Sequence, residues 1–385
     1  MNKTSIFLTL IVISALSLFF ISCKEKKDNP DNMMNLPPLK EQFGEYFDIG
    51  NIFNPGDMSG GRINNQRLTR HYNILTAEND MKPHRLNPSR GTFNFITADN
   101  MVNSAISSGF KVLGHTLLWH SQIPQWQVNL RTDNTSKENA LNQMREYITR
   151  IVTHFKGRVY AWDVLNEVFP DDRFFEDTNW REVMRAGPQG NPWYIKIGAD
   201  FVYEGFLAAR LADPDAILYY NDFNLNNPGK ALMVHNMVRD VNAQYAQDYP
   251  GAGLLIQGIG MQSHHNITVS AKSIRDSLEL FEPLGVLIAI SELDVLSQSY
   301  GDFSRIPYTP PTEQGKTRAA DLYGEYFEVF LEYADIIERV TFWGVYDEQS
   351  WRSRGLPLIF EGRVRSKAKP AYFNIIEALE VFQAK

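Results

Sequence analysis

Residues 286–295 read VLIAISELDV, and this stretch decides which fold the chain is expected to adopt. Its first half is continuously apolar, whereas a strand with one face in water would alternate apolar and polar residues. A continuous apolar run is typical of a parallel strand, covered by helices on one side and packed into a barrel interior on the other. The stretch ends with Glu292 and Asp294. It therefore predicts a buried parallel strand with acidic side chains at its carboxyl end.

Seven further β-rich runs begin with apolar residues and end with polar or aromatic ones. They are FDIGNIF (47–53), ILTAEN (74–79), KVLGHTLLW (111–119), VYAWDVLNE (159–167), ILYYNDFN (217–224), GIGMQSH (258–264) and RVTFWGV (339–345). Helix-patterned stretches separate them, such as ADNMVNSAISSG (98–109) and DFVYEGFLAARLADP (200–214). This alternation indicates an α/β protein with a parallel sheet. Eight strands over residues 39–385 favour one (β/α)8 TIM barrel.

A doubly wound sheet is the competing architecture, but its phosphate-binding motifs are missing from the sequence. No GxGxxG follows the first run, and GxxxxGK[ST] does not occur, so nucleotide chemistry is not indicated. The formal net charge of -7 and the pI near 5.7 give no support to nucleic-acid binding, which relies on basic surface. The negative net charge of the chain is compatible with a neutral polymer as binding partner.

The N-terminal segment has the features of an export signal followed by an anchor. Lys3 precedes an apolar run over residues 6–21, which is shorter than the roughly 20 residues that a membrane-spanning helix needs. Cys23, which directly follows the run, resembles the lipidated cysteine of bacterial lipoproteins and excludes a disulfide within the chain because it is the single cysteine. We expect a signal peptide over residues 1–22, a lipidated Cys23 with a polar tether over residues 23–38, and a catalytic domain over residues 39–385. This organisation predicts an exported protein on the periplasmic or outer face of a bacterial membrane, held only by its lipid.

Two glutamates carry the expected chemistry. Glu167 ends the fourth run and Glu292 lies near the end of the seventh, so both are expected to face one cleft at the carboxyl end of a barrel. Either glutamate on its own could be a structural residue that forms an ion pair at the rim of the barrel. Two carboxylates over one pocket suit glycoside hydrolysis, in which one protonates the leaving oxygen and the other attacks the anomeric carbon.

Alternation along the strands places further polar groups beside Glu292. Glu292 and Asp294 are two residues apart and should point the same way, as should Gln262 and His264. We expect His264 to link the two carboxylates and to help keep Glu292 ionised. A metal site formed with His265 is the alternative, but glycosidase chemistry needs neither a metal nor a cofactor, and no HExxH motif occurs.

Asn166 and three tryptophans are candidate sugar-binding residues. Asn166 precedes Glu167, so the strand must end or bulge there if both are to enter the cleft, where the amide could donate to a sugar 2-hydroxyl. Trp119, Trp343 and Trp351 offer flat apolar faces for pyranose rings, and Trp351 lies in the polar loop sequence DEQSWRSRG. Two other tryptophans are interpreted as structural, Trp126 and Trp193.

The sequence resembles the family 10 glycoside hydrolases, the retaining endo-xylanases, from Leu39 to the last helix. The motifs that carry the resemblance are TAENDMK (76–82), GHTLLWHSQIPQW (114–126), WDVLNE (162–167), NDFN (221–224), GIGMQSH (258–264), ISELDV (290–295), TFWGV (341–345) and KPAYFNI (369–375). The resemblance implies a retaining double displacement on xylan or xylo-oligosaccharides. Glu167 would act as acid/base and Glu292 as nucleophile.

The resemblance also implies which residues bind the sugars. It assigns hydroxyl contacts on the non-reducing side to Glu78, Asn79 and Lys82, and contacts with the attacked sugar to His115, Trp119 and Asn166. Gln262 and His264 would surround the nucleophile, which Asp294 supports, and Trp343 and Trp351 would stack on the glycone sugars. The sequence departs from the family pattern at Pro83, where an aromatic residue is usual, and in the segments 169–193 and 297–314.

Two other functions fit parts of this pattern. A related barrel enzyme could act on another β-1,4-glucan-type polymer, such as cellulose. A surface lipoprotein could bind glycan without cleaving it, although the presence of both carboxylates favours an enzyme.

Overall fold

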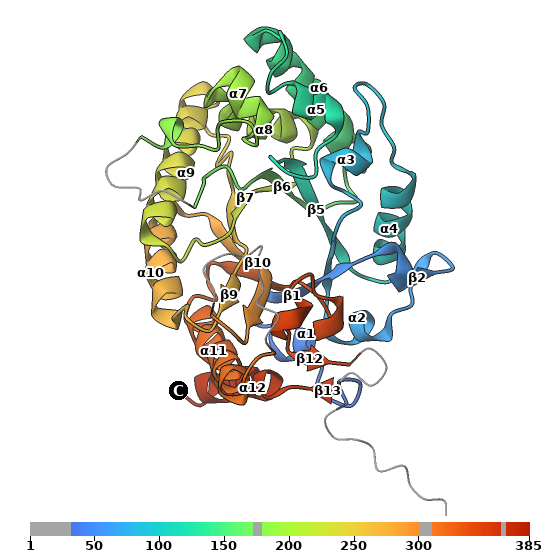
Figure 1. Ribbon diagram of the computed structural model, residues 1–385, viewed down its shortest axis with the longest axis vertical. Coiled ribbons are helices and arrows are strands. Elements are labelled where there is room, and N and C mark those ends of the chain that lie inside the picture. The colour runs from blue at the N-terminus through green and yellow to red at the C-terminus, as the bar shows by residue number, and fades with distance from the viewer. Residues whose placement is uncertain (1–31, 172–178, 300–309, 363–366) are drawn as a thin grey trace, which may run out of the picture.

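Eight parallel strands close into a barrel in the computed structural model, which describes residues 32–171, 179–299, 310–362 and 367–385 (Figure 1). Each strand pairs with the next along the chain, and β11 closes the ring by pairing with both β1 and β10. The strands are β1 (Asp48–Phe53), β4 (Ile74–Ala77), β5 (Lys111–Leu118), β6 (Ala161–Asn166), β7 (Ile217–Asp222), β8 (Gly258–Met261), β10 (Leu287–Leu296) and β11 (Ile337–Phe342). The predicted TIM barrel is confirmed, because a doubly wound sheet would leave two open edges.

Helices surround this barrel and bury the outer faces of its strands (Figure 1). The long ones are α4 (Ile96–Ser107), α6 (Lys137–Phe155), α8 (Asp200–Ala212), α9 (Pro228–Asp248), α10 (Ala271–Phe281), α11 (Glu313–Glu332) and α12 (Pro370–Gln383), and α2 (Gln66–His71) is shorter. Side-chain caps fix several starts: the side chain of Ser136 accepts from Asn139 N before α6, and that of Thr312 accepts from Gly315 N before α11.

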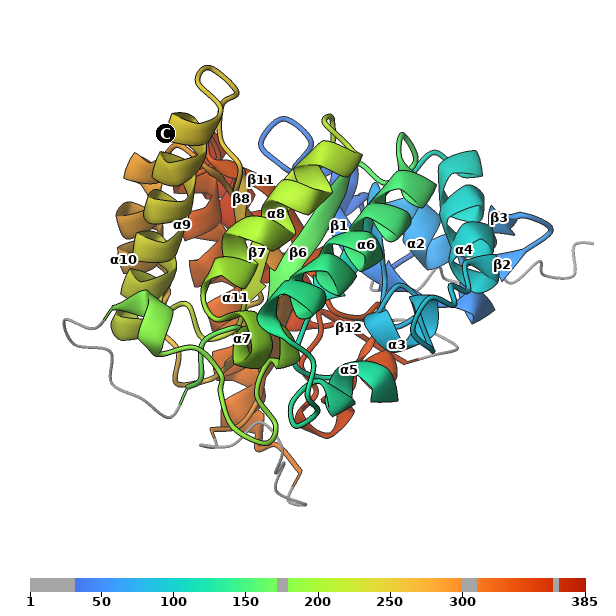
Figure 2. The same cartoon turned by 90° about the horizontal axis from the view of Figure 1, so that it is seen from above.

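Shorter elements lie in the connections. At one end of the barrel, where β4, β5 and β6 terminate, are α3 (Pro83–Leu86), α5 (Gln125–Asn129) and α7 (Pro192–Ile197) (Figure 2). Other short elements are α1 (Leu39–Gln42), β9 (His264–Asn266), which pairs with the end of β10, and two antiparallel pairs, β2 (Met58–Ser59) with β3 (Arg62–Ile63) and β12 (Phe360–Glu361) with β13 (Lys367–Ala368). The end that carries α3, α5 and α7 is therefore the carboxyl end of the barrel strands.

Glycines make room for large side chains on both faces of the barrel strands, for Trp162 in the core between strands and helices and for Tyr219 in the barrel interior. A Cβ atom at Gly114 would lie 2.2 Å from Cε3 of Trp162, and one at Gly258 would lie 2.1 Å from Cε1 of Tyr219. Tyr219 packs with Leu113, Ala161 and Ala289 in a small core inside the barrel, separate from the large core between strands and helices. The interior is thus closed by packed side chains, and a cavity can open only at its ends.

The packed body starts earlier than the sequence predicts. Met33 is fully buried, its carbonyl accepts a 2.7 Å hydrogen bond from His71 Nε2, and Tyr372 OH donates to Pro37 O at 2.8 Å. Residues 32–38 are therefore part of the folded body, which corrects the last part of the tether predicted over residues 23–38. Cys23 and the predicted signal peptide over residues 1–22 lie outside the described residues.

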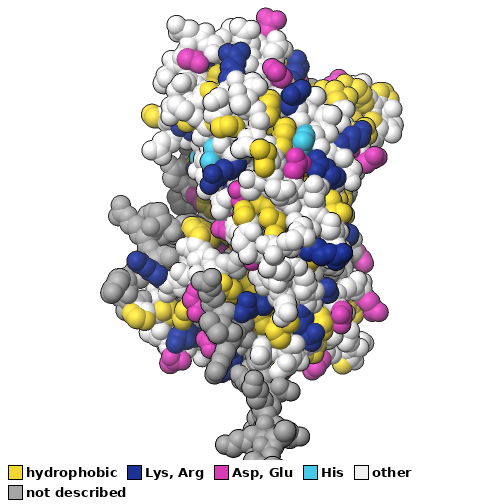
Figure 3. Space-filling model, turned by 90° about the vertical axis from the view of Figure 1, so that its right-hand side faces the viewer, with side chains coloured by type: hydrophobic (Ala, Val, Ile, Leu, Met, Phe, Trp, Pro, Cys, Tyr) yellow, Lys and Arg dark blue, Asp and Glu magenta, His cyan; other side chains and the backbone are white. Residues whose placement is uncertain are grey.

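The surface around α4 carries mixed charge. Figure 3 shows lysine and arginine side chains interspersed with aspartate and glutamate on this face, so no basic stripe forms there. Within the described residues, each helix is too short or too polar to cross a membrane.

Candidate active site

The carboxyl ends of the strands enclose a cavity of about 500 Å³. All the residues predicted to be catalytic or sugar-binding line it, whichever strand they come from: Glu78, Asn79, Lys82, His115, Trp119, Asn166, Glu167, Gln262, His264, Glu292, Trp343 and Trp351. Gln122 and Phe223 line it as well, and the sequence had not assigned a role to either. The structure thus brings the predicted set together, apart from Asp294, which lies behind the cavity wall.

The end of β6 departs from regular strand geometry so that two consecutive side chains enter the cavity. The register with β7 shifts between Asp163 and Leu165, and Glu167 has a left-handed backbone conformation, with φ 56°. Regular alternation would have turned Asn166 and Glu167 to opposite sides. The predicted bulge or strand end is present, and it lets both residues line the cavity.

Glu167 receives hydrogen bonds from three side chains. Trp119 Nε1 donates to Oε2 at 2.9 Å, while Gln262 Nε2 and Asn166 Nδ2 donate to Oε1 at 2.9 Å and 3.2 Å. The backbone is fixed separately, because Arg185 Nε donates to Glu167 O at 3.0 Å. The carboxyl group is therefore held in one orientation with its remaining surface toward the cavity.

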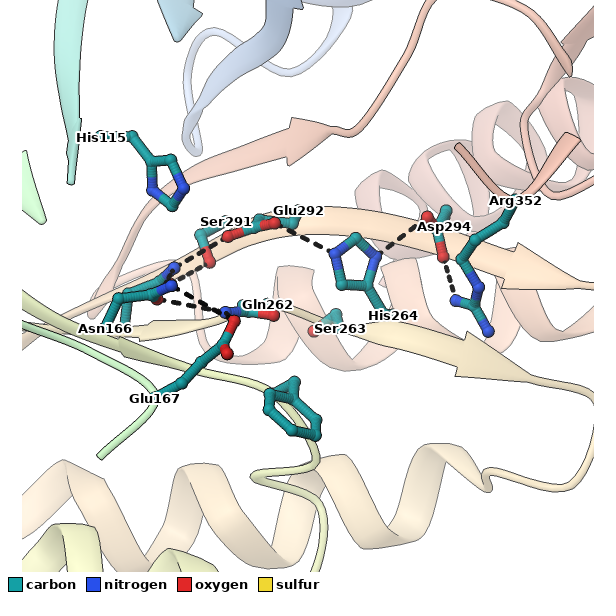
Figure 4. A network of polar contacts seen from close by, with 12 residues as sticks. His115, Asn166, Glu167, Gln262, Ser263, His264, Ser291, Glu292, Asp294 and Arg352 are labelled. Carbon is teal, nitrogen blue, oxygen red and sulfur yellow. Dashed lines mark hydrogen bonds and ion pairs between the residues drawn. The ribbon is translucent and has the colours of Figure 1, made fainter. Parts of the chain in front are cut away.

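Glu292 is buried in β10, just beyond the residues that pair with β8, and is joined to the other glutamate through two amides (Figure 4). Asn221 Nδ2 donates to Glu292 Oε1 at 2.8 Å and to Asn166 Oδ1 at 3.0 Å. Ser291 Oγ donates to Asn221 Oδ1 at 2.6 Å, which fixes the orientation of this amide. Asn221 belongs to the NDFN motif at the end of its run, but its contact with Glu292 links positions 71 residues apart and has no local signal in the sequence.

Three buried charged side chains, His264, Asp294 and Arg352, form a chain of ion pairs that ends on Glu292, and this chain is called the relay below. His264 Nε2 lies 3.0 Å from Glu292 Oε2, and His264 Nδ1 lies 2.9 Å from Asp294 Oδ2. Carboxylates only accept, so both ring nitrogens carry a hydrogen and the imidazole is cationic. Arg352, fully buried, forms an ion pair with Asp294. The predicted link through His264 is present, and Arg352, next to the predicted Trp351, extends it.

In His264 and Glu292, the effect of neighbouring charges and hydrogen bonds on the pKa is larger than the opposing effect of burial. Burial lowers the pKa of His264, but the negative charges of Asp294 and Glu292 outweigh burial and raise it to about 9. Burial raises the pKa of Glu292, but hydrogen bonds from His264 and Asn221 hold it below its usual value. Glu292 is therefore an anion at neutral pH, although it is buried.

The alternative metal site is not assembled by these side chains. His265 follows His264 on β9 but packs against Tyr326, with ring centroids 5.4 Å apart. Throughout the described ranges, His, Cys, Asp and Glu side chains do not gather in any group of three that could hold a metal ion.

Aromatic rings and a buried lysine shape the side of the cavity near Glu292. Trp343 is buried, with its ring centroid 5.5 Å from that of His115, whereas Trp351 is 51% exposed and lies 5.2 Å from the ring of His264. Lys82 Nζ donates to Asn79 Oδ1 at 3.1 Å. Burial lowers the pKa of Lys82, and the nearby glutamates oppose this shift.

Trp126 and Trp193 pack against each other away from the cavity, with ring centroids 5.8 Å apart, as their structural interpretation predicted. They close a separate part of the core beside α5 and α7.

Gln122 is held by His84, the residue that follows the unusual Pro83. Pro83 begins α3, and the next residue, His84, directs both its backbone N–H (3.2 Å) and its ring Nδ1 (2.7 Å) to Gln122 O. Gln122 has a φ of 46°, a conformation that L residues seldom adopt without such support. The motif SQIPQW contained this residue, but the sequence offered no reason to choose it.

Comparison with known proteins agrees with this site. The sequence model of Glycosyl hydrolase family 10 matches residues 38–378. Endo-1,4-beta-xylanase A of Thermotoga maritima is 36% identical over 89% of this chain, which spans 31% of that longer protein. Beta-1,4-xylanase of Dictyoglomus thermophilum is 33% identical over 98% of this chain and 99% of its own length.

A solved structure extends the likeness to three dimensions. It is a GH10 xylanase from termite gut that contains a bacterial Ig-like domain, 50% identical to this chain, with a TM-score of 0.86 over 92% of this chain and 80% of its own. The family model covers nearly all of the described barrel, and these relatives share both sequence and fold with it. The chain therefore belongs to Glycosyl hydrolase family 10.

Proposed function

We propose that the protein is a retaining endo-1,4-β-xylanase, with Glu292 as nucleophile and Glu167 as general acid/base. The observation that carries the proposal is the contrast between the two carboxyl groups. Glu292 is buried, anionic and held by His264 and Asn221, which suits attack on an anomeric carbon. Glu167 lies across the cavity and is oriented by Trp119 and Gln262, which suits proton transfer.

In the first step, Glu292 attacks the anomeric carbon while Glu167 gives its proton to the leaving glycosidic oxygen. A glycosyl ester with Glu292 forms, and the sugars beyond Glu167 depart. In the second step, Glu167 removes a proton from a water molecule, which hydrolyses the ester and releases Glu292 as an anion.

The proposed preference for xylose depends on the space beside the sugar C5 atom. Trp343 and Trp351 would cover the face of the glycone sugars while Glu78, Asn79 and Lys82 bind their equatorial hydroxyls. A pentose fits such a site, whereas the hydroxymethyl group of glucose would displace a ring or leave polar groups unpaired. Unpaired site groups discriminate more strongly than the roughly 1–3 kcal/mol that a missing methylene is worth.

Two measurements test this function. The anomeric configuration of the first product, followed by NMR, should be β for a β-linked substrate, and kcat/KM for xylo-oligosaccharides should greatly exceed that for matched cello-oligosaccharides. An α product would refute the retaining mechanism. Equal kcat/KM for the two series would refute the xylan assignment and leave the mechanism standing.

We also propose that Cys23 carries a lipid that anchors the exported protein to a bacterial membrane. The support is the apolar run over residues 6–21, which is followed by the small residue Ser22 and then by the single cysteine. Cys23→Ser should yield a soluble protein or an uncleaved precursor with full activity on xylan. If this variant still partitions fully into the detergent phase, the apolar run holds the protein and not a lipid.

A further inference from the structure

Helix α3 and the connection between β5 and α5 lie side by side at the carboxyl end of the barrel, and two hydrogen bonds tie them together (Figure 2). Lys82, directly before α3, and Gln122, in the connection, both line the active-site cavity. His84 Nδ1 lies 2.7 Å from Gln122 O, and Trp126 Nε1 of α5 donates to Asn87 O at 3.2 Å. The two segments therefore hold their cavity-lining side chains in a fixed relation.

The backbone of Gln122 depends on support from outside its own segment. Its φ of 46° lies in the left-handed region, which costs an L residue free energy unless neighbouring contacts hold it there. Its carbonyl oxygen accepts from two groups of His84, the backbone N–H at 3.2 Å and the ring Nδ1 at 2.7 Å. The peptide that follows Gln122 is thus fixed by a residue 38 positions earlier in the chain.

The His84 ring makes this hydrogen bond in its neutral form. A carbonyl oxygen only accepts, so Nδ1 carries the hydrogen. Burial lowers the pKa of His84 below its ordinary value of 6.5, and the hydrogen bond to Gln122 O opposes this shift without reversing it. At neutral pH, a neutral amide at the same position could therefore replace the N–H donor of the ring.

We propose that His84 is a positioning residue for the glycone side of the cavity: its ring fixes the peptide of Gln122 and so directs the Gln122 side chain toward the sugars that Lys82 contacts. The inference rests on the proposed xylanase function, in which Lys82 binds hydroxyls of the glycone sugars. His84 lies outside the described lining of the cavity, so it acts on the substrate through Gln122.

Variants of His84 test this role on linear xylo-oligosaccharides. His84→Ala removes the ring donor and should lower kcat/KM about three- to tenfold, the factor that one neutral hydrogen bond contributes. The loss should appear as a higher KM with kcat nearly unchanged, because both glutamates keep their partners. His84→Asn places an amide N–H near the position of Nδ1 and should restore most of the loss. Arg85→Ala is the matched control, since Arg85 is the next residue of α3 and is exposed, and should keep the wild-type KM.

A double-mutant cycle shows whether His84 acts through Gln122. Gln122→Ala should raise KM at least as much as His84→Ala does, and adding His84→Ala to it should cause no further loss, because the positioned side chain is already gone. Losses that multiply in the double variant would overturn the proposal, as would a wild-type KM in His84→Ala or a His84→Asn enzyme as impaired as His84→Ala. A wild-type enzyme that does not cleave linear xylo-oligosaccharides would instead refute the proposed function.

Discussion

At the residue scale, Glu167 and Glu292 line the same cavity, but their hydrogen-bond partners differ and suit them to different chemical roles. Glu292 is reached by a cationic imidazole and an amide, whereas Glu167 is reached by an indole and two amides. Glu292, as a fixed anion, is suited to attack on the anomeric carbon, and Glu167, as an oriented acid, is suited to proton transfer. The two residues should therefore respond differently to removal.

Alanine substitution separates the two roles. Glu292→Ala should abolish turnover of every glycoside, because no glycosyl ester can form. Glu167→Ala should lose about 10²- to 10⁴-fold on xylan but still show a burst with aryl glycosides, whose leaving groups need little protonation. Pre-steady-state kinetics measure the burst. The assignment fails if the Glu167 variant loses the burst and xylan hydrolysis equally while the Glu292 variant retains either.

His264 should control the acidic limb of the pH profile. Replacing it in His264→Gln removes a cation whose hydrogen bond lowers the pKa of Glu292, so that pKa should rise and the acidic limb of kcat/KM should move to higher pH. The matched control is His265→Gln, because burial lowers the pKa of His265 to about 3 and keeps it neutral. An unmoved acidic limb in the His264 variant would contradict the relay.

The same histidine makes stability depend on pH in a defined direction. Its pKa is raised from 6.5 to about 9 by folding, so its stabilisation is complete below about pH 6.5 and is lost as the pH rises through about 9. Urea unfolding should show a larger stability gap between wild type and His264→Gln at about pH 6 than at about pH 10. A gap that grows with pH would show that the histidine is neutral in the folded state.

At the scale of elements, close approach between neighbouring strands depends on glycine. Gly114 in β5 is paired with Trp162 in β6 and faces its ring, which is fully buried and packs against Phe155 of α6, so the ring has little room to move away. Gly114→Ala should destabilise the fold by about 3 kcal/mol, the upper part of the range for overpacked cores. Chemical denaturation measures the change. Gly56→Ala is the control, since its Cβ would meet no atom within 4 Å and should be nearly neutral.

At the scale of the whole molecule, the segment over residues 32–38 ties the N-terminal part of the chain to its C-terminal part. It reaches α2 through His71 and α12 through Tyr372, and Asn32 bridges to Lys367 in β13. A chain without residues 1–31 should keep the wild-type stability. Removing residues 1–38 should cost about 2–4 kcal/mol, because burial of Met33 is lost and His71 is left buried without its acceptor. Equal unfolding midpoints for the two truncated proteins would show that the segment does not stabilise the barrel.

The sequence alone determined the barrel and the set of residues around the cleft. Each barrel strand is a local apolar run, and its polar end lies at the same end of every parallel strand, so Glu167, Glu292 and their neighbours could be placed together without coordinates. The strand irregularity at Asn166 also followed from a local requirement.

Only the tertiary structure decided the partners and the charge states. Asn221 bridges positions 55 and 71 residues away, Arg352 reaches Asp294 across 58, and Met33 meets His71 across 38. No periodicity encodes such contacts, because they depend on how distant elements pack. The cation on His264 is likewise a product of packing, since burial alone would have made it neutral and the two carboxylates brought beside it reverse that effect.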